Sequence, residues 1–208
     1  MIRPIVAYGN PILNQPSSKV DIENEDISNL IDDMWETMNN ANGVGLAAPQ
    51  IGVLKQIFIT DFDYFNEEES FNKSEIEKFQ QVFINPKITD EYGENFLFSE
   101  GCLSIPDILE ELSRKNTIKI EFLDEKFNSI KITCSGVIAR VIQHECDHLK
   151  GILFTDRISS LRKRELKGKL DKSTTLLKNN RKIGLIGVVT EDVVDLSSPG
   201  DNITITDT

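Results

Sequence analysis

The clearest hydrophobic pattern near the start of the chain lies in residues 25–41. Hydrophobic side chains recur there at helical spacing, at Ile27, Leu30, Ile31, Met34, Trp35 and Met38. Asn42 and Gly43 follow as a stop signal. The pattern predicts an amphipathic helix whose methionines and tryptophan face the core rather than a ligand.

A different pattern, alternation with period two, runs through the middle of the chain. Strand-like runs occupy residues 56–60, 81–85, 87–92, 95–99, 117–122 and 129–134. The last two are predicted to form a hairpin joined through 124–128. The acidic stretch 61–78 is predicted to be a surface excursion. The middle of the chain is therefore expected to be mainly antiparallel sheet.

A second amphipathic helix is predicted to start at Ser135 and Gly136. Its apolar side is formed by Val137, Ile138, Val141, Ile142 and Leu149. The predicted fold is α+β, with mainly antiparallel sheets packed around this central helix, an N-terminal helix and a C-terminal helix. Residues 1–170 are expected to form one domain, and 171–208 an unassigned tail.

Between the first helix and the first strand lies a segment rich in glycine, alanine and proline, residues 43–52. This composition argues against a stable regular element. Small residues also let a ligand approach the backbone closely. The segment is therefore either a plain connection or a loop that lines a substrate site.

Composition limits the class of protein. With 208 residues, 39% hydrophobic and 27% charged, the chain has the profile of a soluble globular protein with one domain. No apolar run is long enough to cross a bilayer and no signal peptide is evident, so a cytoplasmic location and no membrane partner are expected. The three cysteines are widely spaced, which argues against a disulfide framework.

Charge is distributed unevenly. The net charge of −11 argues against nonspecific binding of nucleic acid by the whole body, and no specific DNA binding is expected. Residues 162–182, however, contain nine Lys or Arg against two acids, a local charge of +7 that leaves about −18 for the rest. This segment is either a solvated helix or a surface that docks on a polyanion.

Both histidines of the chain lie in one short motif, His144-Glu145-Cys146-Asp147-His148. Positions i and i+4 share a helix face, so the two imidazoles can bind one metal ion. Glu145 lies one step round the helix, where its carboxylate can reach a water on that metal and act as a general base. The motif predicts a metal-dependent hydrolase.

A catalytic metal usually needs a third protein ligand. The candidates are Cys102, Cys134, Cys146 and acids further along, such as Glu165. Cys146 is two residues from each histidine and should point away from the metal, and Cys134 ends a strand as a buried small residue. Cys102 follows a glycine at a junction between strand and turn, and it leads on the residues alone.

Three segments together resemble the signature motifs of the peptide deformylases. They are 43–50 (GVGLAAPQ), 100–104 (EGCLS) and 143–149 (QHECDHL), in that family's order and approximate spacing. The resemblance covers roughly residues 1–170. It implies removal of the N-formyl group from the formyl-methionine end of nascent polypeptides, with release of formate.

The resemblance also implies roles for individual residues. Cys102, His144 and His148 would hold the metal, most often Fe²⁺, with Zn²⁺, Ni²⁺ or Co²⁺ as substitutes. A hydroxide on the metal would attack the formyl carbon while Glu145 moves the proton, and the developing oxyanion would be held by the Gln50 amide and the Leu103 N–H. The substrate would meet Gly45, Leu46 and Gly101. In this family the C-terminal region contacts the ribosome, which would give the basic segment 162–182 a purpose.

The sequence departs from this family in two places, the tail beyond about residue 171, which matches nothing in the family, and the stretch that follows Ser-Ile-Pro. Some members carry a basic residue soon after the Ser-Ile-Pro, whereas residues 107–111 here contain three acids and no basic residue. Arg114 is either an ion-pair partner for Glu100 or Asp147, which would orient the ligand loop against the helix, or a surface arginine. The alternatives to a deformylase are a zinc peptidase, or a binding domain with a structural metal closed by Cys102, Cys134 and the two histidines.

Overall fold

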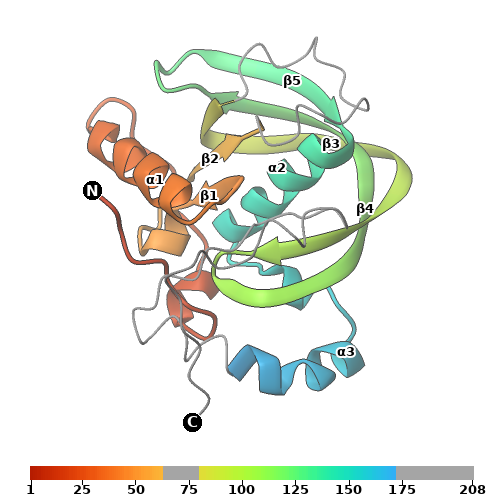
Figure 1. Cartoon of the computed structure of the whole chain (residues 1–208). Coiled ribbons are helices and arrows are strands. Elements are labelled where there is room, and N and C mark those ends of the chain that lie inside the picture. The colour runs from red at the N-terminus through yellow and green to blue at the C-terminus, as the bar shows by residue number, and fades with distance from the viewer. Residues whose placement is uncertain (63–79, 172–208) are drawn as a thin grey trace.

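The computed structural model describes residues 1–62 and 80–171. Its centre is one antiparallel sheet of five strands in the order β1-β2-β3-β4-β5, with helix α2 packed against it. Figure 1 shows α2 in the middle of the molecule, with β3 and β4 curving past it and α1 and α3 further out. The predicted α+β fold with a central helix is confirmed.

The first helix, α1 (Ser28–Asn40), begins three residues later than predicted. The Asp26 carboxylate accepts a hydrogen bond from the Ser28 backbone N–H, which marks the start of the helix. Asn42 at φ 52° ends it as predicted. Its hydrophobic face, including Met34 and Met38, is buried against β1 and β2.

The segment 43–52 contains regular structure that the sequence did not predict. It forms a short strand, β1 (Gly45–Ala47), and a 3₁₀ turn, η2 (Ala48–Ile51). The strand exists because it pairs with β2 (Ile57–Asp61), with Gly45 opposite Thr60. Local composition could not indicate this partner.

The three strand-like runs predicted between 81 and 99 are parts of one strand, β3 (Gln80–Cys102). The residues between the predicted runs, 86 and 93–94, lie at irregularities in the pairing of β3 with β4 (Ile105–Leu123). Register shifts fall between Ile84 and Lys87 and between Tyr92 and Asn95, where Gly93 has φ 83°. The two long strands are joined at Leu103 and Ser104.

The predicted hairpin is confirmed as β4 and β5 (Ser129–Ser135), with Ile120 opposite Ile132. Helix α2 (Gly136–Leu149) follows directly, and η4 (Phe154–Asp156) and α3 (Ser160–Glu165) come after it. A short turn, η1 (Pro11–Asn14), precedes α1. The predicted excursion 61–78 lies largely outside the described residues, as does the tail 171–208 apart from Asp171.

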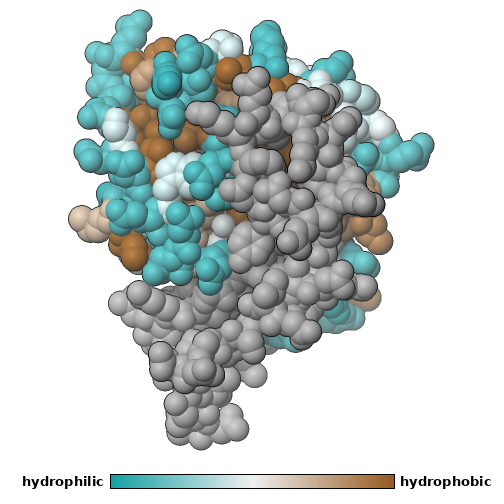
Figure 2. All heavy atoms as spheres, turned by 45° about the horizontal axis from the view of Figure 1, so that its top comes forward, coloured by the Kyte–Doolittle hydropathy of each residue, from teal (hydrophilic) through white to brown (hydrophobic). Residues whose placement is uncertain are grey.

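The hydrophobic core has three parts. One lies between α2 and the sheet and contains Phe58, Phe83 and Ile142; a second lies under α1. The third contains Cys102, Leu13 and Phe154. From outside, the described residues seen in Figure 2 are mostly hydrophilic, with smaller hydrophobic areas between them.

Candidate metal centre

Helix α2 carries the two histidines on one buried face. His144 and His148 are 4% and 1% exposed, and their ring centroids lie 4.9 Å apart. Because they are one helical turn apart, both rings point toward the hairpin end where β3 meets β4. The four-residue spacing of the histidines therefore brings together two of the three possible metal ligands.

The third side chain comes from the last residue of β3. The Cys102 Sγ lies 3.2 Å from His148 Nε2, and the thiol is 3% exposed. One ligand atom from each of Cys102, His144 and His148 lies within 4.8 Å of the others. A thiolate and two imidazoles at this separation fit a divalent transition metal with a fourth position free.

The other sequence candidates lie elsewhere. The side chains of Cys134 and Cys146 belong to the core between α2 and the sheet. Burial raises the pKa of the Cys146 thiol well above its usual range, as expected for packing in a hydrophobic core. Glu165 is exposed and pairs with Arg162. The structure brings none of these three to the histidines.

Glu145 lies beside the cluster, 4% exposed. Its Oε2 has no hydrogen-bond partner among the described residues. Burial raises the pKa of this carboxyl to about 7. A Cβ placed on Gly45 would lie 2.4 Å from Glu145 Oε1, so the carboxylate occupies the space that glycine leaves open.

Gln50 reaches the same cluster from η2. Its Oε1 accepts a hydrogen bond from the Ala47 N–H at 2.8 Å, which fixes the orientation of the amide. The Nε2 then points toward Cys102 Sγ at 3.4 Å and Ser104 Oγ at 3.3 Å. A side-chain donor is thereby held next to the candidate metal ligand.

The remaining predicted site residues lie around this group. Gly101 and Leu103 flank Cys102, and both are buried. A Cβ on Gly43 would lie 2.7 Å from the Leu103 side chain, so the β3–β4 connection packs closely on the segment before β1. Leu46 is fully buried in the core under α1, where it pairs with Ile59 of β2.

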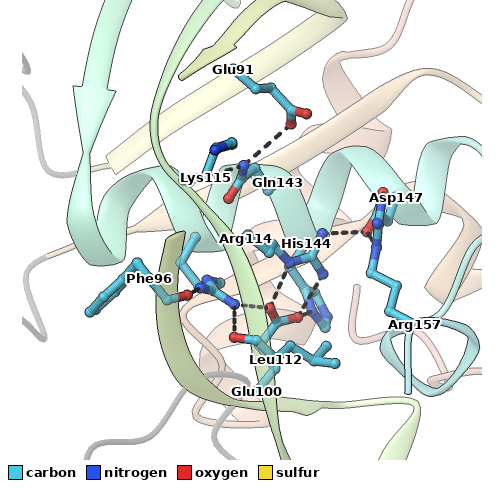
Figure 3. Close-up of polar contacts among 11 residues, drawn as sticks. Glu91, Phe96, Glu100, Leu112, Arg114, Lys115, Gln143, His144, Asp147 and Arg157 are labelled. Carbon is cyan, nitrogen blue, oxygen red and sulfur yellow. Dashed lines mark hydrogen bonds and ion pairs between the residues drawn. The ribbon is translucent and has the colours of Figure 1, made fainter. Parts of the chain in front are cut away.

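Behind the histidines lies a buried network of charged groups centred on Glu100 (Figure 3). Both Glu100 oxygens accept hydrogen bonds from Arg114 at 2.7 Å, and Oε2 lies 3.0 Å from His144 Nδ1. Arg114 Nη1 also donates to Asp147 Oδ2 at 2.6 Å. The predicted pairing of Arg114 is thus found with both acids, and it joins β3 and β4 to α2.

Two arginines of this network, Arg157 and Arg140, were not predicted from the sequence; Arg157 pairs with Asp147. Arg140, 1% exposed, donates to Glu100 Oε1 at 2.8 Å, to the Leu112 carbonyl at 2.8 Å and to the Phe96 carbonyl. The signal was its position four residues before His144, which places a charged side chain on the same helix face.

These contacts shift the pKa values of the two acids in the network. Burial on its own would raise the pKa of Glu100, but hydrogen bonds from His144 and Arg114 hold it well below its usual range. Burial likewise opposes ionisation of Asp147, yet Arg157 and Arg114 lower its pKa. Glu100 is therefore a carboxylate that fixes the His144 ring and leaves Nε2 for a metal.

The two histidines differ in their pKa. Burial lowers the pKa of His148 well below its usual value, which favours the neutral imidazole that ligates a metal. Burial acts the same way on His144, but hydrogen bonds with Cys102 and Glu100 raise its pKa. Ligation needs the deprotonated ring, so metal binding at His144 would release a proton.

Comparison with known proteins gives the family. The sequence model described as polypeptide deformylase matches residues 2–164. The chain belongs to the polypeptide deformylase family. The peptide deformylase of Christiangramia forsetii is 48% identical over 173 residues, covering 82% of this chain and 88% of that one, and that of Flavobacterium johnsoniae is 46% identical over 177 residues, covering 84% and 90%.

Solved peptide deformylases have the same fold. The Legionella pneumophila enzyme superimposes with a TM-score of 0.74 at 34% identity, covering 87% of this chain and 99% of that one. An Ehrlichia chaffeensis peptide deformylase solved with actinonin gives a TM-score of 0.71 at 31% identity, covering 86% and 98%.

Membership of the peptide deformylase family confirms the predicted activity. The chain is a metallohydrolase that removes the N-formyl group from nascent polypeptides. The family uses a catalytic metal, and the cluster of Cys102, His144 and His148 is compatible with one. Across residues 1–62 and 80–171, no helix combines the length and hydrophobicity needed to span a bilayer.

Proposed function

We propose that Cys102, His144 and His148 hold the metal of this deformylase and that Glu145 is its general base and acid. The observation that carries the proposal is the approach of three ligand atoms to within 4.8 Å of one another, with Glu145 Oε2 unpaired among the described residues. A bound divalent metal would supply Lewis-acid activation of water for attack on the formyl carbon. We propose Fe²⁺ as the ion, with Zn²⁺, Ni²⁺ or Co²⁺ able to substitute.

Glu145 performs the proton transfers in this mechanism. It takes a proton from the attacking water and returns it to the nitrogen of the departing peptide, so that formate and a free amine result. Its pKa of about 7, raised by burial, suits both acceptance and donation near neutral pH. The closeness of Gly45 holds the carboxylate in one place.

The negative charge that develops on the formyl oxygen is held by two donors, the Gln50 side-chain amide and the Leu103 backbone N–H. Gln50 suits this role because its Oε1 is already bonded to Ala47 and its Nε2 faces Cys102. Such a donor needs little reorganisation during the reaction.

The substrate, a nascent chain beginning with formyl-methionine, is proposed to lie along β1. This strand is at the edge of the sheet, pairing only with β2 among the described strands. The Val44 carbonyl accepts a hydrogen bond from the Asp61 N–H. By alternation, the Gly45 N–H and C=O therefore point away from β2, where they can pair with an extended peptide, with Leu46 next to them in the strand. Gly101 keeps the opposite wall free of a side chain.

The basic segment 162–182 is proposed to dock on the ribosome, and the enzyme to act in the cytoplasm. Residues 172–182 of that segment lie outside the described residues, but α3 presents exposed basic side chains.

We further propose that residues 1–170 are the catalytic domain, with 171–208 a tail that catalysis does not need.

Formate release from a formyl-methionyl peptide tests the assignment. The protein should be purified without oxygen, its metals measured by elemental analysis, and formate quantified before and after chelation and readdition of Fe²⁺. An intact formyl group alongside stoichiometric metal would overturn the proposal. In that case cleavage of an internal peptide bond would favour the zinc peptidase, and no cleavage the binding domain.

A further inference from the structure

The two donors proposed for the oxyanion come from loops far apart in the sequence. Gln50 lies in η2, and Leu103 lies in the connection from β3 to β4. Donors of this kind are effective only when they are held about 3 Å from the position of the developing charge. Something must therefore fix the separation between the two loops.

The N-terminal segment contacts both loops through its backbone. The Val6 N–H donates to the Gln50 carbonyl at 2.7 Å, and the Tyr8 N–H donates to the Ser104 carbonyl at 2.9 Å. One acceptor belongs to the proposed oxyanion donor itself, and the other to the residue next to Leu103. Both bonds join residues more than 40 positions apart.

The distance between the Val6 and Tyr8 N–H groups sets the distance between the two carbonyls that they bind, those of Gln50 and Ser104. In extended chain, residues i and i+2 point their N–H groups to the same side, roughly 6.5 Å apart. Residues 5–8 have no helical structure and are partly buried, and the side chains of Val6 and Tyr8 pack on the core that contains Cys102. The segment is therefore anchored by its side chains while its backbone holds the two carbonyls.

A turn formed by residues 7–10 follows the extended part of the N-terminal segment. The Asn10 N–H donates to the Ala7 carbonyl at 3.1 Å, and Gly9 has φ 87°. This is the pattern of a type II turn with Tyr8 at its second position and glycine at its third. The turn keeps the Tyr8 N–H directed outward, toward Ser104.

We infer that residues 6–8 are a positioning element for catalysis, whose two backbone hydrogen bonds set the distance between the Gln50 amide and the Leu103 N–H. The inference rests on the proposed function of those two donors. The segment touches no reacting atom, and its effect is expected on kcat rather than on substrate binding.

The type II turn offers a clean test. Proline is favoured at the second position of such a turn, so Tyr8→Pro removes the N–H without disturbing the turn. Tyr8→Ala is the matched reference, because it removes the same ring and keeps the N–H. Relative to Tyr8→Ala, Tyr8→Pro should lower kcat for a formyl-methionyl peptide by roughly 10- to 100-fold, the scale of a 1 Å misplacement, and change KM by less than about 3-fold.

Metal content and thermal unfolding are measured for each variant. Val6→Pro and Val6→Ala form a second matched pair, which tests the hydrogen bond from the Val6 N–H to the Gln50 carbonyl. If either proline variant does not fold, the other pair decides. Equal kcat in the proline and alanine variants would overturn the inference, and so would a change in KM alone. Collapse of both proline variants with both alanine variants folded would also overturn it, since the bonds would then serve folding only.

Gln50→Ala in the same assay separates this inference from the proposed function. If Gln50→Ala keeps full kcat, the oxyanion assignment itself is wrong. If Gln50→Ala loses kcat while Tyr8→Pro matches Tyr8→Ala, only the positioning role of residues 6–8 is wrong.

Discussion

The contact between Gly45 and Glu145 gives the sharpest quantitative prediction. A Cβ at position 45 would lie 2.4 Å from Glu145 Oε1 and 2.9 Å from its Cδ, whereas ordinary contact begins near 3.4 Å. In Gly45→Ala the carboxylate must therefore retreat by about 1 Å. A displacement of that size for a catalytic group costs roughly 100-fold in rate, which corresponds to about 2.7 kcal/mol of activation free energy.

Steady-state formate release should show this loss mainly in kcat. Metal content should remain unchanged, because no candidate ligand is among the three nearest atoms to the added Cβ. Gly168→Ala is the control, since a Cβ there would meet no atom within 4 Å. It should leave kcat at the level of the unchanged protein.

A double-mutant cycle with Glu145→Gln identifies the route of the effect. If alanine at 45 acts by moving Glu145, it should cost almost nothing further once that carboxylate is replaced. An equal loss in both backgrounds would refute this reasoning and point to a direct effect on the substrate. Full activity in Gly45→Ala alone would refute it as well.

Other perturbations test neighbouring parts of the site. Glu145→Gln should keep the metal and lower kcat by roughly 10²- to 10⁴-fold, as measured by formate release and elemental analysis. Cys102→Ser should impair metal binding while Cys146→Ser binds metal normally, and the reverse pattern would contradict the ligand assignment. Arg114→Met should lower the unfolding free energy by about 3–5 kcal/mol in urea denaturation, because it leaves Glu100 buried without its bidentate partner.

The elements that the sequence predicted well are those whose pattern is local. The helix spacing from Ile27 to Met38 and the alternation on either side of the 124–128 turn needed no distant partner. By contrast, β1 exists only through its pairing with β2, and β3 remains continuous past Gly93 only because β4 pairs with it. Each pairing involves two separate segments of the chain, and the pattern within one segment does not show which other segment it pairs with.

The same distinction applies to the site. Helical geometry alone predicts that His144 and His148 lie together, whereas the residues alone make Cys102 only the leading one of several candidates, and the resemblance implies it as the third ligand. The partner of Arg140 could not be predicted from local sequence, because its acceptor, Glu100, is 40 positions away. A charged residue one turn before the first histidine was the available signal, and it identifies a partner only once the hairpin is in place.

The continuous hairpin of β3 and β4 has a consequence for the order of assembly. Glu100, Cys102 and Arg114 all belong to this hairpin, whose strands are adjacent in sequence and can pair early. The histidines arrive with α2, later in synthesis and from a separate element. The Cys102 thiol and the Glu100 carboxylate would thus be in place when the imidazoles dock, and Glu100 would then fix the ring of His144. A metal ion held by Cys102 and both histidines would be bound only after that step, so metal uptake would complete the formation of the enzyme.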